Sequence, residues 1–148
     1  GLYSVLVEGR DEYEPIADAC RGVLDGHVRL SRELAQKGHY PAIDVLSSIS
    51  RVAESVTDAQ QQAARREVVQ CLSNYDEVED LLNVGAYVNG SNPEYDLAIA
   101  CKPAIDQLLQ QGRAESQNLG DFQRTRSQLL ALQHRIDQMR QQIGGNNG

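Results

Sequence analysis

The chain has 148 residues, a formal net charge of −7 and three cysteines. A chain of this length forms one domain, or one and part of another, and buries roughly 70% of its unfolded surface. The acidic balance argues against a nucleic-acid-binding protein, which normally carries a basic face, and no apolar run approaches the length of a membrane span or a secretory leader.

The first part of the chain predicts two strands. Tyr3 to Glu8 is a short run of apolar and β-branched residues ended by Gly9, which is typical of a buried strand. Val28 and Leu30 alternate with polar neighbours and indicate a second strand. Because two strands cannot form a stable sheet alone, we expect further strands from a part of the protein that precedes this chain.

Short helices are expected around the second strand. Pro15 suits the first turn of a helix that Gly26 ends, and Ser31 can cap a short helix that Gly38 ends. A Tyr-Pro turn follows. It leads into Ser48–Arg51, which we interpret as a Ser/Ile loop that carries a lone arginine.

The pattern becomes helical after Val52. Thr57 and Gln60 form a capping-box pattern at the start of a long helix, and Ser73-Asn74 is the place where this helix could break. One apolar stripe runs along it, formed by Ala64, Val68, Leu72, Tyr75, Val78 and Leu82.

A turn and a second long helix come next. Gly85 to Ser91 is expected to be a turn, and Asn92-Pro93 is typical of the N-cap and first residue of a helix. Pro103 should kink or split this helix, and Gly112 should end it.

The last segment has heptad spacing. Residues 122–143 carry an a/d pattern for about three repeats, the lower limit for a coiled coil. Its positions are Phe122, Thr125, Leu129, Leu132, Ile136, Met139 and Ile143. This stripe needs a cover. The cover is either the helical body of the same chain, which is the commoner arrangement for so short a seam, or a helix from another chain.

No motif in the sequence holds a nucleotide by itself. There is no G-x-x-x-x-G-K-[ST] loop for phosphates and no apolar strand that ends in a magnesium-binding Asp. The histidines His27, His39 and His134 match no catalytic triad or metal-ligand spacing, so no metal site is predicted. The three cysteines are far apart in sequence, which favours reduced, buried thiols.

Several ordered blocks of residues point to a known family. They are Ser4–Gly9, Ile16–Asp18, Leu24–His27, Leu30–Arg32, Tyr40–Asp44, Ser48–Val52, Val84–Tyr87, Gly90–Pro93 and Ala98–Ala100. In this order they resemble the bacterial type III export ATPases, the flagellar and virulence enzymes related to rotary ATP synthase catalytic subunits. The resemblance covers residues 1–112. It implies the C-terminal third of such an ATPase, which begins after both Walker motifs.

The resemblance also implies the fold. We expect a mainly α chain: the end of a RecA-like α/β nucleotide-binding core with about two strands, followed by a C-terminal helical domain. We divide it into residues 1–55 for the core, 56–112 for the helical domain and 113–143 for an additional helix that could form a coiled coil. Residues 144–148 are expected to be a disordered tail.

Three site residues follow from the resemblance. Arg51 occupies the arginine-finger position, where a guanidinium reaches the ATP of the neighbouring subunit and stabilises charge in the transition state; a salt bridge to Asp44 is the structural alternative. Tyr40 would lie beside the adenine base, or else fill a gap in the core. Tyr87 is a second adenine candidate, for which core packing is favoured.

The function implied is that of a homohexameric ATPase that energises flagellar or injectisome protein export, with ATP and Mg in the full-length protein. This chain alone lacks both Walker motifs, so it is expected to be inactive and to hold no cofactor. Expected partners are neighbouring copies, a stalk protein and chaperone–substrate complexes. Nucleic acid is not among them, and contact with the membrane is peripheral at most.

The expected location is the cytoplasmic face of the export apparatus. The alternative function is a non-catalytic helical adaptor with the same fold. A Walker A loop upstream of Gly1 distinguishes the two.

Overall fold

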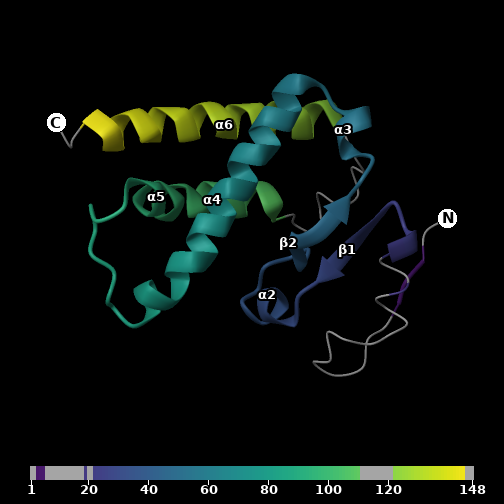
Figure 1. The fold of residues 1–148 in the computed structure, drawn as a ribbon, viewed down its shortest axis with the longest axis horizontal. Coiled ribbons are helices and arrows are strands. Elements are labelled where there is room, and N and C mark those ends of the chain that lie inside the picture. The colour runs from purple at the N-terminus through teal and green to yellow at the C-terminus, as the bar shows by residue number, and fades with distance from the viewer. Residues whose placement is uncertain (1–2, 6–18, 20–21, 111–121, 146–148) are drawn as a thin grey trace.

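The computed structural model describes residues 3–5, 19, 22–110 and 122–145. In this part of the chain a small sheet lies beside three long helices (Figure 1). The sheet contains β1 (Gly26–Leu30) and β2 (Ile43–Ser50), with the short helices α2 (Arg32–Gln36) between them and α3 (Ala53–Val56) after them. The long helices, which all pack against one another, are α4 (Ala59–Asn83), α5 (Pro93–Leu109) and α6 (Phe122–Gly145). The predicted mainly α fold class is confirmed.

The two strands are antiparallel and pair around a bulge. Gly26 pairs with Ser50 and Arg29 with Asp44, so β2 has extra residues in its middle. The carboxylate of Asp44 accepts a hydrogen bond from the backbone N–H of Ser47 at 3.0 Å and another from the Ser47 hydroxyl at 2.6 Å. The bulge interrupts the hydrogen bonds between the two strands, and the bond to Asp44 satisfies the Ser47 N–H there.

Strand β2 differs from the sequence prediction. The loop expected at Ser48–Arg51 is wrong, because β2 continues to Ser50. Polar and apolar residues do not alternate along this strand, so a search for period-2 alternation does not detect it. Hydrogen bonds of side chains in the bulge support the strand instead. Of the strand predicted at Tyr3–Glu8, residues 3–5 are exposed and belong to no strand. The rest of that segment, like half of the helix predicted from Pro15 to Gly26, lies outside the described residues.

The region from β1 through α2 follows the prediction. β1 contains the expected alternating residues, and the Ser31 hydroxyl accepts a hydrogen bond from the N–H of Leu34 at 3.2 Å, as a helix N-cap does. Gly38 follows the helix with φ of 75°, a conformation that favours glycine. The peptide bond between Tyr40 and Pro41 is cis.

Helix α4 begins one residue later than the capping pattern suggests. Its N-cap is Asp58, whose carboxylate accepts a hydrogen bond from the N–H of Gln61 at 2.8 Å. Thr57 donates instead to the carbonyl of Ala53 at 2.6 Å. The helix is also continuous through Ser73-Asn74, because Asn74 is buried and satisfied by Gln70 at 2.9 Å within the helix.

The charge of Asp58 should make stability depend on pH. The Gln61 N–H and the Arg126 guanidinium, in that order, lower the pKa of Asp58 below its ordinary value. Stability from the charged form is therefore complete above that ordinary value and is lost as the pH falls through the folded-state pKa. Wild type should unfold at a higher temperature than Asp58→Asn near neutral pH, and the difference should shrink on acidification.

Thermal unfolding across pH measures this effect. Asp76→Asn, at an exposed position of the same helix, is the matched control. A difference between wild type and Asp58→Asn that does not change with pH would mean that the cap stabilises α4 without its charge.

Helix α5 has the predicted start and no break. The Asn92 side chain accepts a hydrogen bond from the N–H of Glu94 at 3.0 Å, and Pro93 is the first helical residue. The prediction that Pro103 splits the helix is wrong. Pro103 lies on the exposed face, while Cys101 and Ile105 on the buried face hold both halves of α5 in the core.

The hydrophobic core lies between the three long helices. Its buried members are Val68, Cys71, Leu97, Cys101, Ile105, Leu132 and Ile136. Cys71 and Cys101 are free thiols, as the sequence suggested, and the Cys101 thiol donates a hydrogen bond to the sulfur of Met139 at 3.4 Å. Each of the three helices therefore contributes side chains to one continuous core.

Helix α6 is covered by its own chain. Leu132 and Ile136 are buried, and Leu129, Met139 and Ile143 pack against the core, whereas Phe122 at the start of the heptad pattern is exposed. The apolar stripe of α6 is therefore covered by α4 and α5 of the same chain, which is the first of the two arrangements that the sequence left open.

Ion pairs fix α6 against α4. Arg126 binds Asp58 at 2.6 Å, and Arg140 pairs with Glu67. α6 continues through Gly144 to Gly145, so the first two residues of the expected disordered tail are helical. Residues 146–148 lie outside the described part.

Candidate functional site

Arg51 directly follows β2. Its backbone N–H donates to the carbonyl of Asp25 at 2.8 Å, which fixes the main chain where the strand ends. The side chain is exposed, and within the described residues it has no ion pair or hydrogen bond. The alternative salt bridge to Asp44 is not among the ion pairs of the described residues, and the Asp44 carboxylate binds Ser47 in the bulge instead. The guanidinium is therefore free to bind a group from outside.

Tyr40 lies in the loop between α2 and β2. Its side chain is 58% exposed, so it does not fill a gap in the core of this chain. The loop is held on both sides, since Ser31 N–H donates to Ala42 O at 2.8 Å and His39 N–H donates to Leu34 O at 2.9 Å. The ring can offer a face to a planar ligand such as a base.

The length of β2 separates Tyr40 from Arg51. Tyr40 precedes the strand and Arg51 follows it. Their positions therefore give no evidence that both side chains contact the same nucleotide. The two side chains are presented at opposite ends of the same strand.

Tyr87 belongs to the turn between α4 and α5. Its hydroxyl lies 2.9 Å from Asp96 Oδ1 and 3.2 Å from the carbonyl oxygen of Asn92, and its ring centroid is 6.3 Å from that of Tyr95. Partial burial, followed by the hydrogen bond to Asp96, raises the pKa of Tyr87. These contacts anchor the turn on α5.

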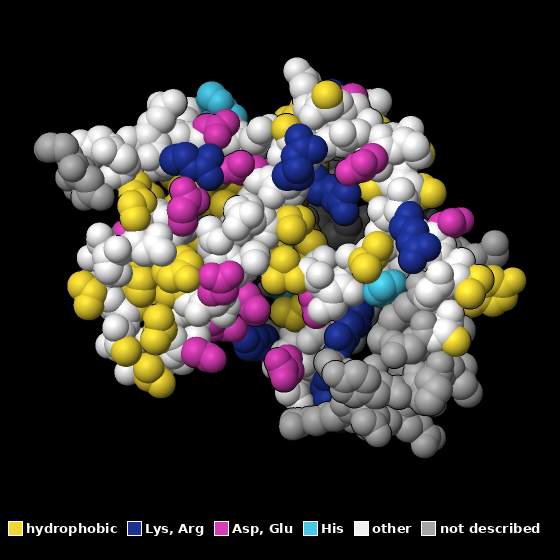
Figure 2. Space-filling view, viewed as in Figure 1, with side chains coloured by type: hydrophobic (Ala, Val, Ile, Leu, Met, Phe, Trp, Pro, Cys, Tyr) yellow, Lys and Arg dark blue, Asp and Glu magenta, His cyan; other side chains and the backbone are white. Residues whose placement is uncertain are grey.

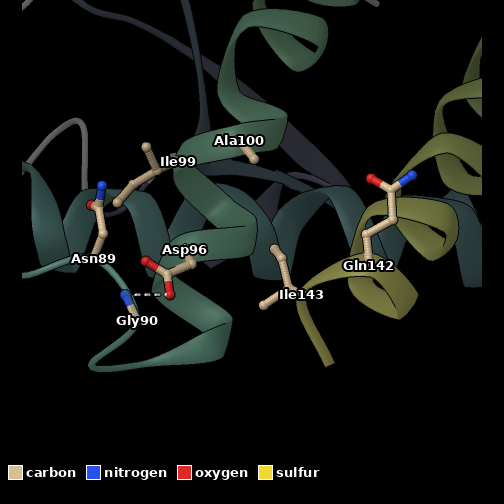
Figure 3. A pocket seen from close by; sticks show the side chains of 7 residues that line it. All are labelled: Asn89, Gly90, Asp96, Ile99, Ala100, Gln142 and Ile143. Carbon is tan, nitrogen blue, oxygen red and sulfur yellow. Dashed lines mark hydrogen bonds between the residues drawn. The ribbon is translucent and has the colours of Figure 1, made fainter. Parts of the chain in front are cut away.

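A groove that the sequence did not predict lies beside this turn (Figure 3). It has a volume of about 520 Å³ and is lined by Asn89, Gly90, Asp96, Ile99, Ala100, Gln142 and Ile143. Its one titratable side chain, Asp96, accepts hydrogen bonds from Tyr87 and from the N–H of Gly90 at 2.9 Å. The groove therefore has no acid–base pair for catalysis. Because its lining comes from the turn, α5 and the end of α6, no local pattern could have revealed it.

Neither metal chemistry nor a membrane span is apparent in the described residues. No group of three or more His, Cys, Asp or Glu side chains is arranged there to hold an ion. None of the helices described is both long and apolar enough to cross a membrane. On the face shown in Figure 2, Lys and Arg side chains are interspersed with Asp and Glu side chains and form no single basic area.

Two family models match the chain. Residues 56–131 match the T3SS EscN ATPase C-terminal domain. Residues 1–50 match the nucleotide-binding domain of the ATP synthase alpha/beta family.

Similar proteins come from flagellar and virulence systems. The chain is 51% identical over 130 residues to the flagellum-specific ATP synthase of Pseudomonas aeruginosa, an alignment that covers 88% of this chain and 29% of that protein. The assembled ATPase EscN from the type III secretion system of enteropathogenic E. coli superposes with a TM-score of 0.78 at 35% identity, over 87% of this chain and 31% of EscN.

EscN in complex with its central stalk EscO superposes with a TM-score of 0.72 at 35% identity, over 81% of this chain and 29% of EscN. The chain thus spans less than a third of the length of each of these proteins. It belongs to the family of type III secretion and flagellar export ATPases, and it corresponds to their C-terminal domain together with part of the nucleotide-binding domain.

Proposed function

We propose that this chain is the C-terminal part of a homohexameric ATPase that energises flagellar or injectisome protein export. In the full-length protein, ATP and Mg bind to Walker motifs that this chain lacks. Arg51 acts as an arginine finger on the ATP of the neighbouring subunit. The helices α4, α5 and α6 bind the stalk, a chaperone or an export substrate.

The guanidinium of Arg51, exposed and without a partner among the described residues, carries this proposal. A finger must reach across an interface, so its side chain cannot be held by its own subunit. Arg51 meets that requirement in the part of the chain that the structure describes, because its main chain is fixed by Asp25 while its side chain contacts no partner there. The serines and Asp44 before it form a bulge that stiffens the end of β2.

Exposed apolar side chains around the sheet support a larger assembly. They belong to β1, β2 and the start of the helical region, and include Val28, Leu30, Leu46, Ile49, Val52 and Val56. So many apolar groups on a two-stranded sheet require a cover. In our proposal the rest of the nucleotide-binding domain and the neighbouring subunit provide it.

Tyr40 is proposed to contact the adenine of the nucleotide bound by its own subunit, opposite the interface that Arg51 serves. Its exposed ring and its loop, held by hydrogen bonds, support this role. The predicted contact between Tyr87 and adenine stays a prediction. The hydrogen bond of Tyr87 to Asp96 supports a structural role as an anchor of the turn.

The proposed partners follow from relatives. EscN is described as an assembled ATPase and as a complex with its central stalk EscO. By similarity, we propose self-association and a stalk partner for the protein that contains this chain, at the cytoplasmic face of the export apparatus. Residues 1–55 then serve the nucleotide site, and residues 56–143 serve these partners.

The 148-residue chain alone should not hydrolyse ATP. Its sequence contains neither a Walker A loop nor a Walker B strand to hold magnesium together with the β- and γ-phosphates, so the Arg51 finger would have no substrate. Phosphate release by the purified chain, measured beside the full-length ATPase at equal subunit concentration, tests this. Turnover by the short chain at a rate similar to that of the full-length protein would refute the proposed division of roles.

A further inference from the structure

His39 is the buried polar residue of the loop that carries Tyr40. It is 7% exposed, although it directly precedes the exposed Tyr40. Its backbone N–H donates to the carbonyl of Leu34 at the end of α2. The loop therefore directs one side chain inward and the next outward, toward the proposed nucleotide.

The imidazole of His39 faces the last turn of α5. Its Nδ1 lies 3.4 Å from Nε2 of Gln110 and 3.9 Å from Oδ1 of Asp106, while its Nε2 is buried with no hydrogen-bond partner in the described residues. A buried ring nitrogen without a partner is costly. The ring is therefore held in place by packing and by its contacts on the Nδ1 side.

Asp106 connects this contact to the helical bundle. Lys102 donates to both carboxylate oxygens of Asp106, at 2.7 and 2.6 Å, and its ammonium lies 5.0 Å from the ring centroid of Tyr75 in α4. His39 thus touches a charged network that joins α5 to α4. A displacement of the last turn of α5 would displace His39, and with it Tyr40.

A second link between the same loop and the bundle is weaker. Lys37 pairs with Glu79 of α4 at 3.1 Å, but the two side chains are 62% and 33% exposed. Exposed ion pairs contribute little to the position of a loop because water screens them. Among the described residues, the buried His39 contact is therefore the main connection from this loop to the long helices.

We infer that His39 is a positioning residue that couples the Tyr40 loop to the last turn of α5, so that the loop and the helical domain move together. The role of Tyr40 in base binding rests on the proposed function. The mechanical link between the loop and α5 does not depend on the proposed function. Through it, a partner that shifts α5 would change nucleotide binding without touching the nucleotide.

Hydrogen exchange in the full-length protein tests the link without nucleotide. Coupling is reciprocal, so a change on either side should affect the other. His39→Ala should speed exchange in residues 106–110, and the double variant Asp106→Ala/Gln110→Ala should speed exchange in residues 37–42, each by about tenfold, as expected for loss of a buried polar contact.

Matched controls separate the link from general loosening. His134→Ala changes an exposed histidine of α6 and should alter neither segment, and Gln107→Ala changes an exposed glutamine of α5 and should not alter exchange in residues 37–42. His39→Gln keeps a hydrogen-bonding side chain and should restore most of the protection, which also covers the case that His39→Ala folds poorly. Exchange in 106–110 that is the same in wild type, His39→Ala and His39→Gln would overturn the inference.

Nucleotide kinetics test how His39 acts. Tyr40→Ala should raise the KM for ATP about tenfold, as loss of base stacking does. His39→Ala should raise it severalfold with little change in kcat, and should add nothing in the Tyr40→Ala background, because it acts through Tyr40. An equal rise in both backgrounds would overturn the coupling. If Tyr40→Ala leaves KM unchanged, the proposed base contact fails instead, and the exchange experiment alone decides the link.

Discussion

Replacing Arg51 with alanine in the full-length ATPase is expected to lower kcat by about 10³-fold or more, with a much smaller change in the KM for ATP. An arginine finger stabilises charge that develops on the γ-phosphate oxygens in the transition state, and contributes little to ground-state binding. Steady-state phosphate release at saturating and subsaturating ATP separates the two parameters.

Arg32→Ala is the matched control, because Arg32 is another exposed arginine that follows a serine. It should leave kcat within a few-fold of wild type. Arg51→Ala should also leave thermal unfolding unchanged, since the side chain has no partner in the described structure. A raised KM with unchanged kcat would show that Arg51 contacts the ground state or has a structural role.

A mixing experiment tests whether Arg51 acts in trans. Subunits with Arg51→Ala and subunits with a disabled phosphate-binding loop are each expected to be inactive. Mixed hexamers place an intact Arg51 beside an intact ATP site at some interfaces, so part of the activity should return. Mixtures that stay inactive although they assemble would argue that Arg51 serves its own subunit.

Replacing Ile136 with aspartate should destabilise the protein by about 4 kcal/mol or more, because it buries a charge without a partner and removes core packing. Ile136 is 0% exposed and lies in the core between the three long helices. Leu129→Asp should cost less, though still several kcal/mol by the same principle, because Leu129 is only partly buried. Urea unfolding followed by circular dichroism measures both.

Phe122→Asp is the control within the same heptad pattern. Phe122 occupies the same heptad position as Leu129, one repeat later, and Ile136, two repeats later. It is 53% exposed, so its replacement should change stability little. If Ile136→Asp left unfolding unchanged and abolished self-association or stalk binding instead, α6 would be a partner-facing coiled coil in solution, contrary to its packing in the structure.

Helix caps and turns were predictable because their bonds are local. Ser31 caps α2 through a residue three positions away, and Asn92 caps α5 through a residue two positions away. The start of α4 was misplaced by one residue because Thr57 and Asp58 are both good caps, and only the helix geometry decides which of them receives the N–H of Gln61.

The candidate site was predictable only in part. Resemblance proposed Arg51 and Tyr40 as site residues, which stays a prediction, and it left open whether Arg51 pairs with Asp44. The structure resolves that alternative through the bulge of β2, where Asp44 binds Ser47. The link from His39 to Gln110 was beyond sequence reasoning, because the two residues are 71 positions apart.

The sequence by itself determined the mainly α character, the order of the long helices and the family. Apolar periodicity, helix caps and short family motifs depend only on residues that are neighbours in the sequence. Only the tertiary structure decided that Ile43–Ser50 is a strand, that α5 passes through Pro103 unbroken and that α6 is covered by its own chain. The physical reason is common to all three. Each outcome depends on the free energy of contacts between distant segments, which outweighs the local preference of the residues involved.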